Sequence, residues 1–131
     1  IVSGGAGDDL LDGGLGADTI YGQGGTNTIH GRAGNDQIIG GDNRDVIFGE
    51  ADIDNIAGQA GDDDAFGGDG NDIVFGGPGA DFLYGEAGDD TLNGEAGNDF
   101  ADGGTDERSR RSGRAGKSAK EFRVQPFRIA A

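Results

Sequence analysis

The 131-residue chain contains no cysteine and no run near the ~20 apolar residues that a membrane-spanning helix needs. The lack of cysteine excludes a disulfide framework and a thiolate metal site, and it leaves the redox compartment open. No signal-peptide pattern is visible at the N-terminus, and the chain starts at Ile1 instead of Met. We therefore expect a fragment or a processed product of a longer protein.

Basic residues are scarce over most of the chain. Residues 1–104 contain 22 Asp and Glu against only Arg32 and Arg44, a net charge of −20. Residues 105–131 contain eight Lys and Arg against three acids, a net charge of +5. This division predicts an acidic body, 1–104, and a basic C-terminal tail, 105–131. The acidic body should repel nucleic acid and anionic membranes and attract multivalent cations.

Most of the 30 glycines recur with a period of nine. Eleven units follow one another without insertion from Gly4 to Asp102, and position 1 of each unit is glycine. Position 4 is glycine in nine units, with Asn43 and Asp52 as the exceptions. The glycines at position 1 are Gly4, Gly13, Gly22, Gly31, Gly40, Gly49, Gly58, Gly67, Gly76, Gly85 and Gly94. So regular a register argues against acidic low-complexity disorder, although the composition alone is typical of it.

Two further positions of the unit are nearly constant. Position 6 is aspartate in ten units and Asn27 in the third: Asp9, Asp18, Asn27, Asp36, Asp45, Asp54, Asp63, Asp72, Asp81, Asp90 and Asp99. Position 8 is aliphatic throughout: Leu11, Ile20, Ile29, Ile38, Ile47, Ile56, Ala65, Val74, Leu83, Leu92 and Ala101. Val2 occupies position 8 of a preceding, incomplete unit.

Each unit reads as a turn followed by a short strand. Glycines at positions 1, 2 and 4 permit positive φ and a tight turn, and Asn43 and Asp52 are side chains that tolerate such angles. Positions 7 to 9 are often β-branched or aromatic, which predicts a strand with position 8 facing inward. A strand of this length is not stable alone, so we expect the units to stack.

The pattern G-G-x-G-x-D-x-U-x resembles the RTX, or hemolysin-type, calcium-binding nonapeptide repeats, over about three quarters of the chain. With two units per coil, it implies an all-β fold: a parallel β-roll, or β-solenoid, of stacked 18-residue coils. The resemblance also implies Ca²⁺ ions between successive turns of one edge, held by the position-6 side chains and by turn carbonyls near the position-1 glycines.

Stacking at 18 residues distributes position 6 over two edges. The first edge carries Asp9, Asn27, Asp45, Asp63, Asp81 and Asp99, and the second carries Asp18, Asp36, Asp54, Asp72 and Asp90. Aspartates about 4.8 Å apart repel one another unless a cation lies between them. Five gaps on one edge and four on the other give up to about nine Ca²⁺ ions. Asn27 lacks charge, so the two gaps beside it should bind most weakly.

Other kinds of site fit the sequence poorly. An EF-hand fails because "DDDAFG" places Phe66 where a ligand is needed. The glycine turns are lined by carboxylates, which excludes a phosphate-binding loop, and neither HExxH nor G-x-S-x-G is present. The single histidine, His30, falls at position 9 on an outward face, so no catalytic residue is assigned. Position 9 on one face also reads Phe48, Phe66 and Tyr84, either a stacked ladder within the sheet or a partner-binding stripe.

The basic tail breaks the nine-residue period after Gly103-Gly104. It occupies the place of the C-terminal secretion signal of RTX proteins, but it can equally be a disordered arm or a cap on the open end of the stack. We expect disorder for residues 105–120.

These observations predict a calcium-binding module that folds on binding calcium and is not itself an enzyme. The resemblance implies a secreted, extracellular bacterial protein exported by type I secretion. Alternatives are the non-catalytic C-terminal part of a secreted protease or lipase, and a repeat spacer of an adhesin. The predicted partners are calcium ions, without nucleic acid and without a membrane span. We also expect attachment to a larger secreted protein, or end-to-end self-association.

Overall fold

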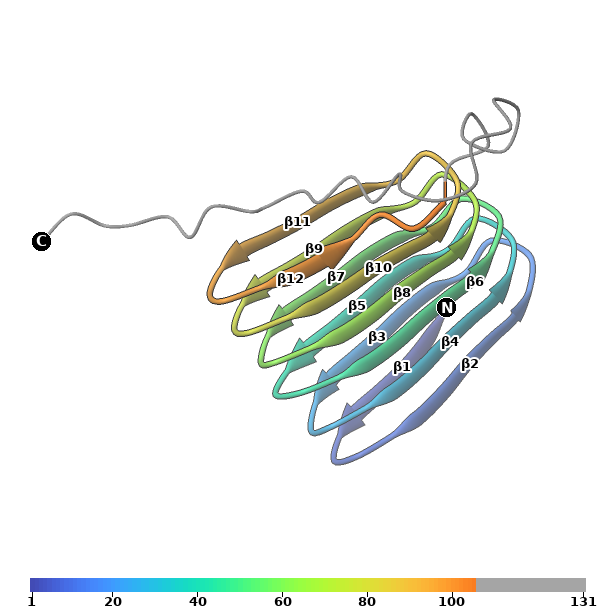
Figure 1. Cartoon of the computed structure of the whole chain (residues 1–131). Helices are drawn as coiled ribbons and strands as arrows, with labels where there is room; N and C mark the ends of the chain where they lie inside the picture. The colour runs from blue at the N-terminus through green and yellow to red at the C-terminus, as the bar shows by residue number, and fades with distance from the viewer. Residues whose placement is uncertain (106–131) are drawn as a thin grey trace, which may run out of the picture.

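The computed structural model describes residues 1–105, which form a stack of flat coils built from strands (Figure 1). The strands are β1 (Val2–Ala6), β2 (Leu10–Leu15), β3 (Thr19–Gly24), β4 (Thr28–Ala33), β5 (Gln37–Asp42), β6 (Val46–Ala51), β7 (Asn55–Ala60), β8 (Asp64–Asp69), β9 (Ile73–Pro78), β10 (Phe82–Ala87), β11 (Thr91–Ala96) and β12 (Phe100–Asp102).

The strands alternate between two parallel sheets of six strands each. Sheet A has the order β1-β3-β5-β7-β9-β11, and sheet B has the order β12-β10-β8-β6-β4-β2. Each strand pairs with the one 18 residues away, as in the pairing of Ile20 with Ile38 and of Ile29 with Ile47. The predicted β-roll with two units per coil is confirmed, in about six turns.

The core is a double row of position-8 side chains between the two sheets. Eight of these side chains have no exposed surface: Ile20, Ile29, Ile38, Ile47, Ile56, Ala65, Val74 and Leu83. Leu11 and Leu92 near the two ends are 7% and 8% exposed, and Val2 and Ala101 pack against the same cluster. Position 8 therefore faces inward in both sheets, as the aliphatic pattern predicts.

The strands are longer than the sequence indicates. They run through positions 7, 8 and 9 and continue through positions 1, 2 and 3 of the next unit, so that β4 spans Thr28–Ala33. The turn is confined to positions 4, 5 and 6. The prediction of strand at positions 7 to 9 alone was too short, because it treated every glycine as a turn residue.

The glycines of the unit are needed for two different structural reasons, which depend on their position. Positions 2 and 4 adopt positive φ, including Asn43 at 72° and Asp52 at 77°, as expected. Position 1 does not, and the prediction of a turn conformation there was wrong. A side chain at position 1 has no room instead: a Cβ on Gly40 would lie 2.7 Å from the carbonyl oxygen of Gly58.

The aromatic residues of position 9 form a stacked ladder on the outer face of sheet B. The rings of His30, Phe48, Phe66 and Tyr84 lie with centroids 4.9 to 5.0 Å apart and with nearly parallel planes. Their spacing follows the distance between strands, so the stack adds side-chain contact along the axis of the roll.

The repeat pattern of backbone pairing reaches Thr105, which forms a bridge with Ala87 beyond the short strand β12. The expectations of disorder, a cap or a secretion signal in the basic tail fall on residues that, apart from Thr105, lie outside the described range.

Candidate metal centre

Position 6 places two columns of polar side chains inside the turns, one along each edge of the roll. Six of these aspartates are at most 2% exposed, and Asn27 is fully buried. The turn holds them there because the position-6 carbonyl accepts the N–H of position 7 one coil further on, as in the 2.8 Å bond from Thr28 to Asp9. The sequence-predicted site residues are thus brought together in the two predicted columns.

One oxygen of nine of these eleven side chains accepts a hydrogen bond from the neighbouring coil. In all nine gaps, the backbone N–H of a position-6 residue donates to Oδ1 of the position-6 residue 18 further along, at 2.8 to 3.1 Å. The N–H of Asp45, for example, donates to Oδ1 of Asp63 at 2.8 Å. These bonds orient the accepting side chains and fix which oxygen of each accepting carboxylate remains.

The remaining oxygen, Oδ2, is buried without a hydrogen-bond partner in eight aspartates: Asp9, Asp36, Asp45, Asp54, Asp63, Asp72, Asp81 and Asp90. A buried acceptor without a donor costs about 1 to 3 kcal/mol, and more when it is charged. A regular series of eight such atoms therefore indicates a site for a ligand that interacts with these oxygens.

Burial shifts the protonation of these carboxyl groups. Loss of hydration raises the pKa of Asp54 and Asp63 to about 7 and that of Asp72 and Asp81 to about 6. Repulsion from neighbouring carboxylates adds to the effect, and the N–H···Oδ1 bond opposes it. Burial and mutual repulsion thus disfavour the ionised form of these carboxyl groups.

At several position-1 glycines, a carbonyl oxygen of the next coil lies beside the same space as Oδ2. A Cβ placed on Gly40 would lie 2.6 Å from Oδ2 of Asp45 and 2.7 Å from the carbonyl oxygen of Gly58. The same arrangement recurs at Gly31, with Asp36 and Gly49. The missing side chain at position 1 thus leaves a space toward which a carboxylate and a glycine carbonyl both point.

These residues fit a calcium ion by their chemistry. Calcium takes six to eight hard oxygen ligands, including carboxylates and backbone carbonyls, in a flexible geometry. Within residues 1–105, no three or more His, Asp or Glu side chains gather around a single point. A cation in a gap therefore needs backbone carbonyls or water to complete its coordination.

Asn27 differs from every other member of the columns. Its Oδ1 accepts the N–H of Asp9 at 3.1 Å, while its own N–H donates to Oδ1 of Asp45 at 2.8 Å. Its Nδ2 donates to the carbonyl oxygen of Gly25 at 3.3 Å. No atom of the Asn27 side chain is left buried without a partner.

Sequence reasoning missed a second ladder, at position 5 on the outside of the turns. There the side-chain oxygens of Asp8, Asn35, Asp62 and Asn71 accept backbone N–H groups of the next coil at 2.8 to 3.1 Å. The recurrence of Asp and Asn at position 5 is the signal in the sequence. These exposed side chains hold coils together, and they provide matched controls for position 6.

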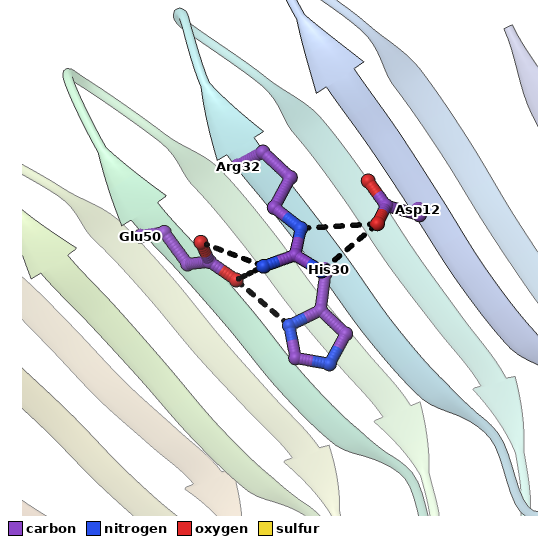
Figure 2. A network of polar contacts seen from close by, with 4 residues as sticks. All are labelled: Asp12, His30, Arg32 and Glu50. Carbon is purple, nitrogen blue, oxygen red and sulfur yellow. Dashed lines mark hydrogen bonds and ion pairs between the residues drawn. The ribbon is translucent and has the colours of Figure 1, made fainter.

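The few basic residues of the body pair with acids of neighbouring coils on the outer face. Arg32 bonds to Asp12 at 2.9 Å and approaches Glu50, which also lies 2.7 Å from Nδ1 of His30 (Figure 2). The pairing lowers the pKa of Asp12 and raises that of Arg32, chiefly through their side-chain hydrogen bond. His30 is thus a structural residue in a surface network and is not part of the buried position-6 columns.

A parallel β-solenoid with two inward columns of aspartates, one per turn of each edge, defines a repeat module of the metal-binding class. The family model of the RTX calcium-binding nonapeptide repeat matches residues 1–29, 21–56, 39–74, 48–83 and 75–107. The chain belongs to this family, whose repeats bind Ca²⁺, form β-rolls and are typical of secreted bacterial proteins. Comparisons with curated proteins and with solved structures found no significant match.

Residues 1–105 contain no helix that is both long enough and apolar enough to cross a membrane.

Proposed function

We propose that this chain is a calcium-responsive folding module of a secreted bacterial protein, and that its position-6 columns hold the ions. The observation that carries the proposal is the series of eight buried Oδ2 atoms without a hydrogen-bond partner. The carbonyl oxygens of the position-1 glycines, which point into the same spaces, supply further ligands of the kind that calcium prefers.

Calcium binding is coupled to folding because forming the two aspartate columns without an ion costs free energy. Closing the roll moves ionised aspartates out of water and places them one coil apart, where each raises the pKa of its neighbours. A bound Ca²⁺ ion supplies the positive charge that lets these carboxylates stay ionised inside the turn. The unfolded chain keeps the same carboxylates hydrated and apart, so it has no formed site, and binding energy becomes folding energy.

The balance of charge supports several ions. The body carries a net charge of −20, and both of its basic side chains already pair with acids on the outer surface. Up to nine gaps are available, five on the first edge and four on the second. Nine Ca²⁺ ions would bring +18.

The biological setting that we propose is export. A chain that stays unfolded at low calcium can pass a narrow channel, and it folds in the calcium of the extracellular medium. The module itself needs no catalytic residue and stiffens what is attached to it. The edge strands β1 and β11 of sheet A can pair with further coils of the parent protein or, end to end, with a second copy.

The experiment is a calcium titration followed by circular dichroism. The chain should show little β signal with a chelator and gain it cooperatively as calcium is added. Magnesium should substitute poorly, because it demands a rigid octahedron at ~2.1 Å and retains its waters. A full β spectrum in chelator that calcium leaves unchanged would contradict the proposal, and equal folding midpoints in the two metals would contradict the assignment to calcium.

A further inference from the structure

Asn27 is the one position-6 residue whose side chain is neutral at every pH, and it is completely buried in the third unit of the first edge. In every gap the position-6 N–H of one coil points at the position-6 side chain of the next coil. This N–H can only donate. Whatever side chain stands at position 6 must therefore turn an oxygen toward it.

An aspartate meets this demand and keeps a second oxygen for the space above the position-1 glycine. An asparagine has one oxygen, and in Asn27 that oxygen accepts the N–H of Asp9 at 3.1 Å. The amide NH₂ is then forced into the place where the aspartates put Oδ2. A Cβ on Gly22 would indeed lie 2.8 Å from Nδ2 of Asn27, whereas one on Gly40 would lie 2.6 Å from Oδ2 of Asp45.

The orientation of the amide is fixed by its surroundings. Rotating it by half a turn would set two donors, Nδ2 and the Asp9 N–H, against each other and would remove the bond from Nδ2 to the Gly25 carbonyl. The gap between Asn27 and Asp45 therefore presents N–H groups where seven of the other eight gaps present a buried, unpaired carboxylate oxygen. A donor with positive hydrogens repels a cation.

We propose that Asn27 closes the Asn27–Asp45 gap to calcium and holds its two coils together by hydrogen bonds alone. This inference rests on the proposed function and sharpens it. The roll then offers eight calcium gaps instead of nine. The Asp9–Asn27 gap keeps its carboxylate, because Oδ2 of Asp9 is buried and unpaired.

The test counts bound calcium per chain at saturation, by native mass spectrometry and by equilibrium dialysis. Asn27→Asp should bind one ion more than the wild type. Asn35→Asp is the matched control: Asn35 is an exposed position-5 residue whose Oδ1 accepts the Ile53 N–H, so the same added charge should leave the count unchanged.

The reverse exchange keeps the test decisive if Asn27→Asp does not fold. Asp63→Asn should bind one ion fewer, because the Asp45 N–H would claim its only oxygen. Its neighbour Asp62, exposed and bonded to the Ala80 N–H, gives the control Asp62→Asn with an unchanged count. Unchanged counts in folded Asn27→Asp, or in Asp63→Asn, would overturn the inference. A wild type that binds no calcium would instead overturn the proposed function.

Discussion

A buried carboxylate with one oxygen hydrogen-bonded and the other unpaired can be relieved by a proton or by a cation. The unpaired Oδ2 atoms of Asp54 and Asp63 face this choice near neutral pH, since burial raises the pKa of both groups to about 7. The sequence could predict that these aspartates lie in the turns, because the chain carries one at the same position of each nine-residue unit. It could not predict which oxygen is unpaired, since that depends on a backbone N–H from a residue 18 positions earlier.

The same pKa values predict how the calcium-free chain responds to pH. In the folded state the pKa of Asp54 and Asp63 is about 7, against an ordinary value of 3.8, so both groups keep their proton up to near neutral pH. The stabilising contribution is therefore complete below about pH 4, declines as the pH rises above that value, and is lost once the pH passes the folded-state pKa of about 7. In calcium-depleted buffer, we expect a stronger β spectrum at pH 5 than at pH 8. The double variant Asp54→Asn, Asp63→Asn should depend less on pH, and a stronger spectrum at pH 8 in the wild type would refute the argument.

At the scale of the element, the strands and turns follow from the unit only in part. Alternation of inward aliphatic and outward residues over positions 7 to 9 is a property of side chains, so the sequence shows it. The continuation through positions 1 to 3 is not visible, because glycine has no side chain to mark an inward face. In sheet B, Gly31 and Gly49 are buried strand residues that leave room for a carboxylate, and sequence reasoning had treated them as turn residues.

This distinction predicts that two glycine-to-alanine changes have unequal costs. In Gly14→Ala the new Cβ meets nothing within 4 Å, and the cost is the left-handed φ of 94°, about 1 kcal/mol. In Gly40→Ala it would lie 2.6 Å from Oδ2 of Asp45 and 2.7 Å from a backbone oxygen, which cannot move aside. We expect a loss of about 3 kcal/mol in unfolding free energy, the upper end for overpacking.

Urea unfolding at saturating calcium measures both variants. Six units already carry a side chain at position 2, with φ between 65° and 82°: Gln23, Arg32, Glu50, Gln59, Glu86 and Glu95. Their presence shows that the fold accepts the strain at Gly14. Equal losses for the two variants would mean that the space at position 1 has no role.

At the scale of the whole roll, residues 1–105 form a one-dimensional stack in which each coil contacts the coils before and after it. Sheet pairing, the aliphatic rows, the position-5 and position-6 hydrogen bonds and the aromatic ladder all join residues one coil apart. Stability in such a stack is close to a sum over coils and their interfaces. A defect in the middle therefore divides the cooperative run, whereas a defect at an end shortens it.

Asp63 and Asp9 test this property. Asp63 is fully buried and serves two gaps: its Oδ1 accepts the Asp45 N–H at 2.8 Å, and its Oδ2 faces the next coil without a partner. Asp9 is only partly buried, and it contributes to a single gap, which it shares with Asn27. Asp63→Ala should therefore damage calcium-dependent folding more than Asp9→Ala.

The expected ratio follows from linkage. With free calcium at ten times the dissociation constant, a lost site removes roughly 1.4 kcal/mol, and each change removes one. Asp63→Ala also leaves the buried N–H of Asp45 without its acceptor, which costs about 1 to 3 kcal/mol more, so the interior change should cost about twice the terminal one. Division of the stack at Asp63 adds to this difference, because the coils on either side then fold as shorter runs. The measurement is the calcium midpoint of folding for both variants in one buffer. If Asp9→Ala shifts the midpoint as far as Asp63→Ala, the aspartates act as independent sites or as diffuse charge, and ligands shared between successive coils are not what holds the roll closed.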